Sequence, residues 1–362
     1  MRKSIRFALL AIAASAALAF AGSAFASFTP KLWASSFDSL IGTQGFELAL
    51  SQDDVATAKA QIYVGPFDFA DVPGGTTGTQ IGTVDASVKA LALGGAILPL
   101  PGKVEVSDST VYPANNPCTL GATSHAATWV LVLTAPTGTE LRVPMYVDNV
   151  PTAQPPNPQL GKYRISVCLP SPYVDPSVGG AQFGAKLIRA TITMTNFIST
   201  VDNTWTAIVT PYVEGTATAN PAGTVETQSV VTNGYINALK AKLVKKKSGT
   251  KIKYFAKVSG SVGAGGEGAA ANIKIFQAKG KKPGKKLKTT KSKSSGSFSA
   301  LIPLKKTMAF YVLASKARGD VTPPVCDPQL ELAPGVPMPC TAVTTSGFDA
   351  AKISRKVTLP KK

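Results

Sequence analysis

The feature that most constrains the fold is a period-two alternation of apolar and polar side chains that recurs along the chain. In residues 251–258, Ile252 and Tyr254 point to one face of an extended strand, and Lys251 and Lys253 point to the other. One apolar and one charged face is typical of an antiparallel sandwich, whose sheets pack on a core and meet water on the outside. Helical spacing with capping residues is almost absent. The chain is therefore predicted to be all-β.

The first 26 residues have the layout of a signal peptide. A positively charged start precedes an apolar run over residues 7–20, and the small residues Ala24 and Ala26 form a cleavage site, so we expect the mature chain to begin at Ser27. The run is shorter than the ~20 residues of a membrane span. No second apolar run follows. We predict a secreted, extracellular bacterial protein with no transmembrane anchor, which would need a non-covalent partner to stay on the cell surface.

About 336 residues remain after cleavage, more than one hydrophobic core usually serves. The two halves of this chain differ sharply in charge. Residues 27–235 contain 9 basic and 15 acidic residues, whereas residues 236–362 contain 26 basic and 5 acidic residues. Such asymmetry predicts a domain boundary. We predict a signal peptide over residues 1–26, an acidic β-sandwich with long loops over residues 27–235, and a basic, immunoglobulin-like β-sandwich over residues 236–362.

Part of the basic half carries a pattern of its own. A strand ends in Val258-Ser259-Gly260-Ser261-Val262, Ile273-Lys274-Ile275 follows, and a lysine-rich strand leads to Ser295-Gly296-Ser297-Phe298-Ser299. In this pattern, residues 250–314 resemble the immunoglobulin-like modules of secreted bacterial proteins, including the carboxypeptidase-regulatory-like type. The resemblance implies a stalk, spacer or ligand-presenting module without chemistry of its own. We recognise no family in residues 27–235.

The four cysteines are even in number in an exported chain, which indicates disulfides. Three pairings are open. Cys118–Cys168 and Cys326–Cys340 keep each bridge inside one predicted domain. A zinc site is not expected, because the sequence has no C-x-x-C pair and His125 is its only histidine.

Little in the sequence points to catalysis. A Ser-His-Asp triad would depend on His125 alone, and no G-x-S-x-G elbow is present. We therefore predict no enzyme, no catalytic residues and no cofactor. The loop aspartates at Asp53–Asp54 and at Asp68 and Asp71 leave a calcium site open, although their spacing is not that of a dedicated calcium loop, and turn caps explain them equally.

Lysine clusters give the strongest functional signal. The net charge of +21 on residues 236–362 exceeds the ~2–8 that solubility asks of a small domain. Lysine outnumbers arginine there by 24 to 2, which favours diffuse attraction over bidentate recognition. We predict binding to an anionic cell-wall or extracellular polysaccharide, and no sequence-specific nucleic acid; the simpler alternative is that the lysines only aid solubility. The predicted contact residues are Lys245, Lys246, Lys247, Lys281, Lys282, Lys285, Lys286, Lys288, Lys291 and Lys293.

A second hypothesis is a carbohydrate-binding module that recognises a neutral glycan through the N-terminal domain. Sugar rings stack on aromatic platforms, and Trp33, Trp129 and Trp205 are the only tryptophans. The apolar runs around Trp129 and Trp205 predict core positions, so Trp33 is the candidate platform. The tripeptide Arg318-Gly319-Asp320 is interpreted as a turn.

Overall fold

The computed structural model describes residues 27–35, 43–64, 72, 74–112, 118–119, 124–150, 160–161, 163–195, 203–326 and 331–360. These residues form β-strands and short 3-10 segments and no α-helix, so the prediction of an all-β protein is confirmed. No helix in this part of the chain is long and apolar enough to span a membrane. The predicted signal peptide lies outside the described residues, with Ala24 and Ala26; Ser27 is the first residue inside them.

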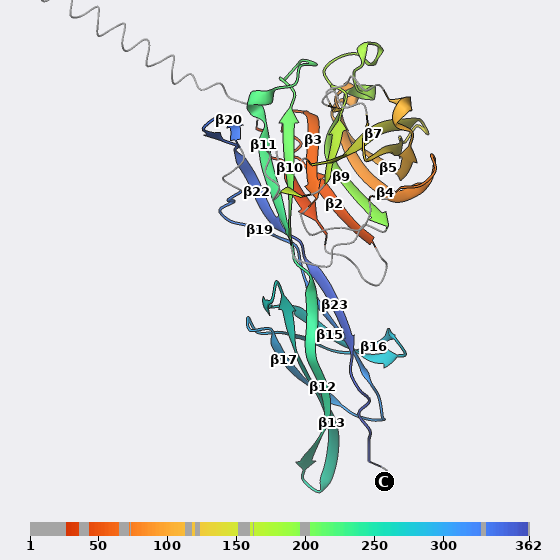
Figure 1. The fold of residues 1–362 in the computed structure, drawn as a ribbon. Coiled ribbons are helices and arrows are strands. Elements are labelled where there is room, and N and C mark those ends of the chain that lie inside the picture. The colour runs from red at the N-terminus through yellow and green to blue at the C-terminus, as the bar shows by residue number, and fades with distance from the viewer. Residues whose placement is uncertain are drawn as a thin grey trace, which may run out of the picture.

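The larger part of the molecule, here called the N-terminal body, is one curled sheet of 13 strands (Figure 1). Alternation along β4 sends Val84 and Ala86 into the core, whereas Thr83 and Asp85 face outward. Trp129 and Trp205 are buried, as predicted, and fill this core. The strands are β1 (Lys31–Ala34), β2 (Thr43–Ala49), β3 (Thr57–Val64), β4 (Gln80–Ala90), β5 (Ala96–Ser107), β6 (Ala127–Thr134), β7 (Glu140–Asn149), β8 (Tyr163–Cys168), β9 (Ala185–Thr195), β10 (Asn203–Pro211), β11 (Val225–Val231), β19 (Gly319–Val321) and β22 (Cys340–Thr345).

Several short elements lie at the ends of this sheet. A two-stranded hairpin lies beside β22, and the remaining elements are single 3-10 turns in the connections (Figure 1). They are η1 (Leu91–Leu93), η2 (Ser109–Val111), η4 (Pro176–Val178), η5 (Gln182–Gly184), η6 (Pro221–Gly223), β20 (Glu331–Ala333) and β21 (Val336–Pro337).

Buried hydroxyl groups hold the first strand against the last strands of the sheet. The Thr227 hydroxyl accepts a hydrogen bond from the Leu32 amide (3.1 Å) and donates one to the Ala342 carbonyl (3.1 Å). The Thr344 hydroxyl donates to the Leu32 carbonyl (2.5 Å), and Ser229 Oγ accepts from the Ala34 amide (2.9 Å). These side chains, here called the hydroxyl seam, satisfy backbone groups of β1 that would otherwise be buried without partners.

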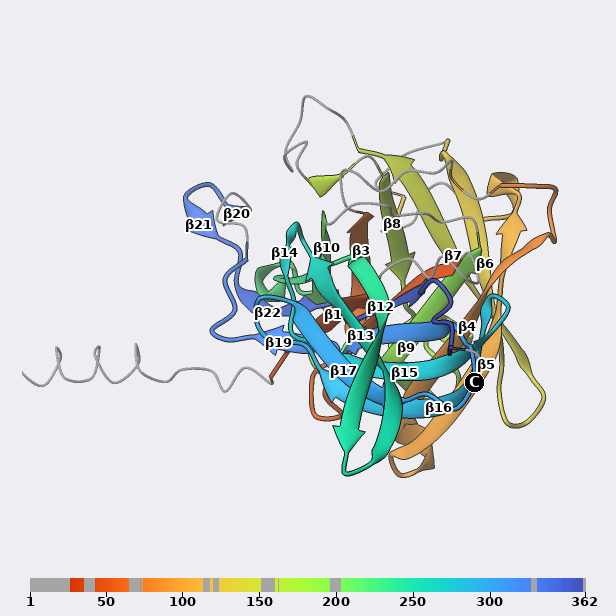
Figure 2. The ribbon, with the colours of Figure 1, turned by 90° about the horizontal axis from the view of Figure 1, so that it is seen from below.

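The second part of the molecule, here called the lysine module, comprises residues 234–316 and 348–360 and extends from one end of the N-terminal body (Figures 1 and 2). Two sheets enclose a separate core that contains Ile273, Phe298 and Phe310. One sheet holds β12 (Gly234–Ser248), β13 (Lys251–Ala264), β14 (Glu267–Gly268) and β17 (Ser297–Pro303). The other has the order β16 (Lys282–Lys291), β15 (Asn272–Lys279), β18 (Phe310–Lys316) and β23 (Phe348–Ile353).

The chain passes between the two parts three times, at residues 232–233, 317–318 and 346–347. After β18 it returns to the N-terminal body, adds β19 and β22 to the 13-stranded sheet, and only then enters β23. The predicted domain boundary before residue 236 placed this returning segment in the basic half, because its strands do not differ in pattern from their neighbours.

The crossing strands lie close together. Ser346 donates its amide proton to the Val230 carbonyl (2.8 Å) and accepts at Oγ from the Thr232 amide (2.9 Å). A Cβ at Gly347 would overlap the carbonyl oxygen of Lys316, so the third crossing needs a glycine. Three crossings, of which the first and third are joined by hydrogen bonds, make a stiffer junction than one linker does.

Both disulfides have the pairing that the sequence analysis favoured, Cys118–Cys168 and Cys326–Cys340. The first joins residue 118 to the end of β8. The second closes the segment that carries the β20–β21 hairpin and begins β22, so it stabilises the N-terminal body.

Substitution of Thr227 by Val tests the hydroxyl seam. The change keeps the side-chain volume but leaves the Leu32 amide and the Ala342 carbonyl without this partner, so we expect a loss of about 1–3 kcal/mol in unfolding free energy. All three tryptophans lie in the N-terminal body, so urea denaturation followed by tryptophan fluorescence reports on it.

The matched control is Thr83→Val, at an exposed threonine of β4, which should change stability by less than about 0.5 kcal/mol. Equal effects of the two substitutions would show that the seam does not hold β1 in place.

Candidate functional site

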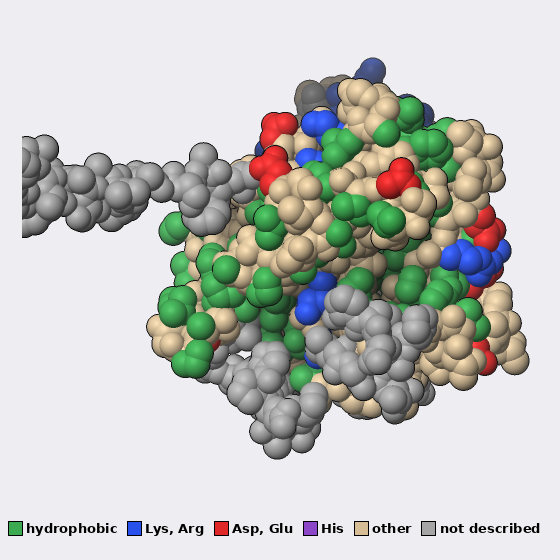
Figure 3. Space-filling model, turned by 90° about the horizontal axis from the view of Figure 1, so that it is seen from above, with side chains coloured by type: hydrophobic (Ala, Val, Ile, Leu, Met, Phe, Trp, Pro, Cys, Tyr) green, Lys and Arg blue, Asp and Glu red, His purple; other side chains and the backbone are tan. Residues whose placement is uncertain are grey.

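The lysine module carries 23 of the 38 Lys and Arg residues of the chain. Residues 234–316 and 348–360 contain 23 Lys and Arg residues and only two carboxylates, Glu267 and Asp349, a formal charge of +21. All 23 cationic side chains are exposed. Two further acids of the basic half, Asp320 and Glu331, lie in β19 and β20, beyond the module. The opposite end of the molecule exposes mainly uncharged side chains among those drawn (Figure 3).

The β12–β13 hairpin places lysines directly opposite lysines. Lys242 faces Lys257, and Lys246 faces Lys253 across the two antiparallel strands. Their alternate neighbours Leu243 and Ala256 pack on the module's core, so the lysines occupy the outer face. Like charges directly opposite in a sheet are destabilising. The Lys246 ammonium also lies 5.7 Å from the centre of the Phe255 ring, a favourable cation–π distance.

The second group of lysines follows β15 and β16. Lys279 faces Lys282 at the end of this hairpin, and Lys286 and Lys288 face Phe276 and Ile275. Because β16 is the edge strand of its sheet, its lysines also hinder pairing with another chain.

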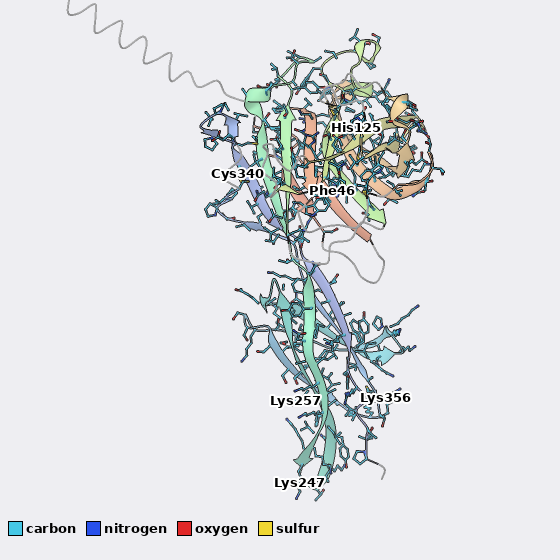
Figure 4. The ribbon with its side chains drawn as sticks, viewed as in Figure 1. Phe46, His125, Lys247, Lys257, Cys340 and Lys356 are labelled. Carbon is cyan, nitrogen blue, oxygen red and sulfur yellow. A yellow bond between two sulfur atoms is a disulfide. The ribbon has the colours of Figure 1, made fainter. Side chains whose placement is uncertain are left out.

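The structure places the ten predicted contact lysines in two groups. Lys245, Lys246 and Lys247 lie at the far tip of the β12–β13 hairpin, where Figure 4 labels Lys247, and the other seven lie in or beside the β15–β16 hairpin. Lys242 and Lys257 were not among the predicted contacts, although their alternation with buried neighbours indicates that they face outward.

No carboxylate neutralises these lysines among the described residues. Carboxylate–cation pairs within 4.0 Å are confined there to the N-terminal body and the junction. The Lys352 ammonium instead donates to the Ile236 carbonyl (3.0 Å), and the Lys288 ammonium donates to the Leu301 carbonyl (3.3 Å). The positive surface therefore faces solvent without an ion-pairing carboxylate from the described part of the chain.

A cavity of about 410 Å³ lies where the module meets the N-terminal body, with Trp33 in its lining. The guanidinium of Arg318 lies 4.5 Å from the centre of the Trp33 ring and donates to Glu47 Oε1 (3.1 Å). Thr191 donates to the other oxygen of the same carboxylate (2.9 Å). The Arg318–Glu47 pair was not predicted from the sequence, because 271 positions separate the two residues.

The interpretation of Arg318-Gly319-Asp320 as a turn is wrong. Gly319–Val321 forms β19, which pairs with β22. Asp320 forms an ion pair with Lys31 (3.2 Å), and Arg318 binds Glu47, so both charged side chains of the tripeptide contact the N-terminal body.

His125 is largely buried and paired. Its Nδ1 lies 2.6 Å from Asp148 Oδ1, and Arg164 donates to the other carboxylate oxygen of Asp148 (3.0 Å). The His125 ring also packs on Tyr146, with 4.7 Å between ring centres. This buried group links β7, β8 and the segment before β6.

The loop aspartates that left a calcium site open have separate positions. Asp54 is buried and accepts from the amides of Thr29 and Ser51 (both 3.0 Å), whereas Asp53 is exposed. The chain's own donors therefore occupy the Asp54 carboxylate. Asp68 and Asp71 lie outside the described residues. In the part of the chain that the structure describes, no three His, Cys, Asp or Glu side chains are grouped to hold a metal ion.

Comparison with known proteins gives little. No protein-family model matches the chain, and no curated protein matches it. Among solved structures, the crystal structure of a tetra-tandem repeat in the extending region of a large adhesion protein is 11% identical. The match covers 91% of this chain and 74% of that chain with a TM-score of 0.16, which supports no conclusion about fold or function.

Substitution of Lys242 by Glu tests the electrostatic strain in the β12–β13 hairpin. The change replaces the like-charge pair with Lys257 by an opposite-charge pair. We therefore expect the unfolding free energy of the module to rise by roughly a few tenths of a kcal/mol. Differential scanning calorimetry at low salt should show a higher melting temperature, and the gain should shrink in about 0.5 M NaCl because salt screens exposed charges.

Lys274→Glu is the matched control, because it makes the same charge change on a strand where the residue faces Thr289 and Leu313. If both variants raise the melting temperature equally, net charge and not the cross-strand pair is responsible.

Proposed function

We propose that this chain is an exported, non-catalytic binding protein whose lysine module attaches electrostatically to anionic polymers of the cell envelope or the extracellular space. The observation that carries the proposal is the 23 exposed cationic side chains of the module, which are without ion pairs among the described residues. An anionic polymer would supply the missing counter-charge.

Solubility alone is a weaker explanation of this surface. A charge of +21 exceeds the ~2–8 that keeps a small domain dissolved, and self-repulsion at that level destabilises the compact state. The facing pairs Lys242–Lys257 and Lys246–Lys253 add local repulsion that an alternation with acids would avoid. A bound polyanion would relieve both kinds of repulsion.

The chemistry of the cations favours a repeating charge over a defined small anion. Of the 23 cationic residues, 22 are lysines, whose flexible ammonium groups attract phosphate, sulfate or carboxylate without fixed geometry. The module offers strands and no recognition helix for reading a nucleic-acid sequence. We propose attraction that depends on charge density and not on sequence.

The architecture supports an immunoglobulin-like module. Leaving aside the two-residue β14, the first, second and fifth strands (β12, β13 and β17) share one sheet. The fourth, third, sixth and seventh strands (β16, β15, β18 and β23) form the other. A constant-type immunoglobulin sandwich has strands A, B, E and D in one sheet and C, F and G in the other, so every strand except the fourth lies in the corresponding sheet.

Export is supported by the signal-peptide layout of residues 1–26 and by the two disulfides, which form in oxidising compartments. Cleavage after Ala26 would remove none of the residues that the structure describes. In this proposal the module attaches to the polymer and the N-terminal body is held away from it.

Binding of the full mature chain to immobilised dextran sulfate tests the proposal, with neutral dextran as the blank. Replacing Lys242, Lys246, Lys247, Lys253 and Lys257 by Gln should weaken binding at least about tenfold, because each cation near an anionic surface contributes on the order of 1 kcal/mol. Binding of the unmodified chain should fall steeply between about 0.05 M and 0.5 M NaCl.

The matched control replaces the same five lysines by Arg, which keeps the charge and should keep the affinity. Binding that survives high salt, or that the Gln variant retains in full, would rule out electrostatic attachment through this hairpin.

A further inference from the structure

The cavity at the junction is built by both halves of the chain. One wall comes from β1, β2 and β9 of the N-terminal body, and the other comes from the end of β18 and from residues 346–349. Its volume of about 410 Å³ lies within the ~300–1,000 Å³ range of small-molecule sites, which often occur between domains. Three crossing strands fix the two walls relative to each other.

The polar groups in this cavity are already held in position. Glu47 is buried, and its two carboxylate oxygens bind Arg318 and Thr191, at 3.1 and 2.9 Å. The Arg318 guanidinium lies 4.5 Å from the centre of the Trp33 ring, within cation–π distance, and the Arg318 side chain remains 53% exposed. A guanidinium has five N–H donors, and only one hydrogen bond to Glu47 is present among the described residues. The others are available to a ligand in the cavity.

The charges of the lining cancel. Arg318 and Lys316 balance Glu47 and Asp349, in contrast to the strongly cationic outer surface of the module. A polyanion therefore has no electrostatic advantage in this cavity. Alternating donors and acceptors around a partly exposed tryptophan suit a neutral ligand with many hydroxyl groups, because each hydroxyl both donates and accepts.

We propose that the junction cavity binds a short neutral saccharide. Arg318 donates to ring hydroxyls, the carboxylates of Glu47 and Asp349 accept from them, and Trp33 supplies the apolar surface beside the sugar ring. This site is separate from the polymer-binding surface, so the protein would attach through its lysines and recognise a glycan at the junction.

Tryptophan fluorescence gives a direct readout of the site. Trp33 is partly exposed in the cavity, whereas Trp129 and Trp205 are 1% and 0% exposed. A saccharide in the cavity should therefore change the emission of Trp33 alone. The probes are cellobiose, maltose and chitobiose, titrated into the full mature chain, with affinities checked by isothermal titration calorimetry.

Three variants test the assignment. Trp33→Ala should abolish the fluorescence change and the calorimetric signal, and Arg318→Lys should weaken binding at least about tenfold, because an ammonium cannot reproduce the planar donor array. Arg142→Lys is the matched control, since Arg142 forms an exposed ion pair with Glu140 elsewhere in the N-terminal body and should leave binding unchanged. A cooperative urea unfolding transition with an unchanged midpoint verifies that each variant still folds.

Saccharide binding should persist at high salt, so its outcome is distinguishable from that of polymer attachment. The proposal is overturned if none of the three saccharides binds. It is equally overturned if Arg318→Lys binds as well as the unmodified chain, or if short charged peptides compete better than any sugar.

Discussion

The hydroxyl seam between β1 and the pair β11–β22 determines how the two parts of the protein can be arranged. Thr227, Ser229 and Thr344 bind the backbone of β1, and they stand on strands that lie on either side of the lysine module in the sequence. The N-terminal body is therefore complete only after the chain has passed through most of the module and returned. Residues 234–316 of the module are inserted between two strands of this sheet, and residues 348–360 join the module after the third crossing, so three crossings make the junction stiff.

Because of this connection, the cationic surface of the module has a fixed orientation relative to the N-terminal body. Two acids of the basic half lie in β19 and β20, which belong to the returning segment and not to the module. The module therefore contains 23 cationic residues and only two carboxylates. Because the N-terminal body uses Glu47 and Asp320 to bind Arg318 and Lys31, these acids are not turned toward the module's lysines. The repulsion that remains is the physical reason to expect an anionic partner. The same stiff junction also forms the cavity around Trp33 and Arg318.

Period-two alternation was sufficient to predict an all-β chain, the buried positions of Trp129 and Trp205 and the outward lysines of β13, because alternation and burial follow from local sequence. The cysteine pairing followed from keeping each bridge local. The return of residues 319–345 could not be predicted in this way, since nothing in the local sequence around Val343 and Thr344 indicates which strand β22 pairs with. The hydroxyl seam could not be predicted for a similar reason: nothing in the sequence distinguishes the buried Thr227 and Thr344 from solvent-facing threonines. Arg318 and Glu47 meet only through this long-range topology, so Trp33 was the one residue of the cavity that the sequence indicated as a binding residue.

The return of the chain also decides how attachment must be measured. Deleting residues 236–362 would remove β19 and β22 and open the hydroxyl seam, so loss of binding in such a truncation would not identify the binding surface. Amide hydrogen exchange of the intact chain, with and without dextran sulfate, locates the contact directly. The account predicts added protection confined to residues 240–257 and 279–293, with residues 43–231 unchanged. Protection of the N-terminal body in place of these two hairpins would contradict it.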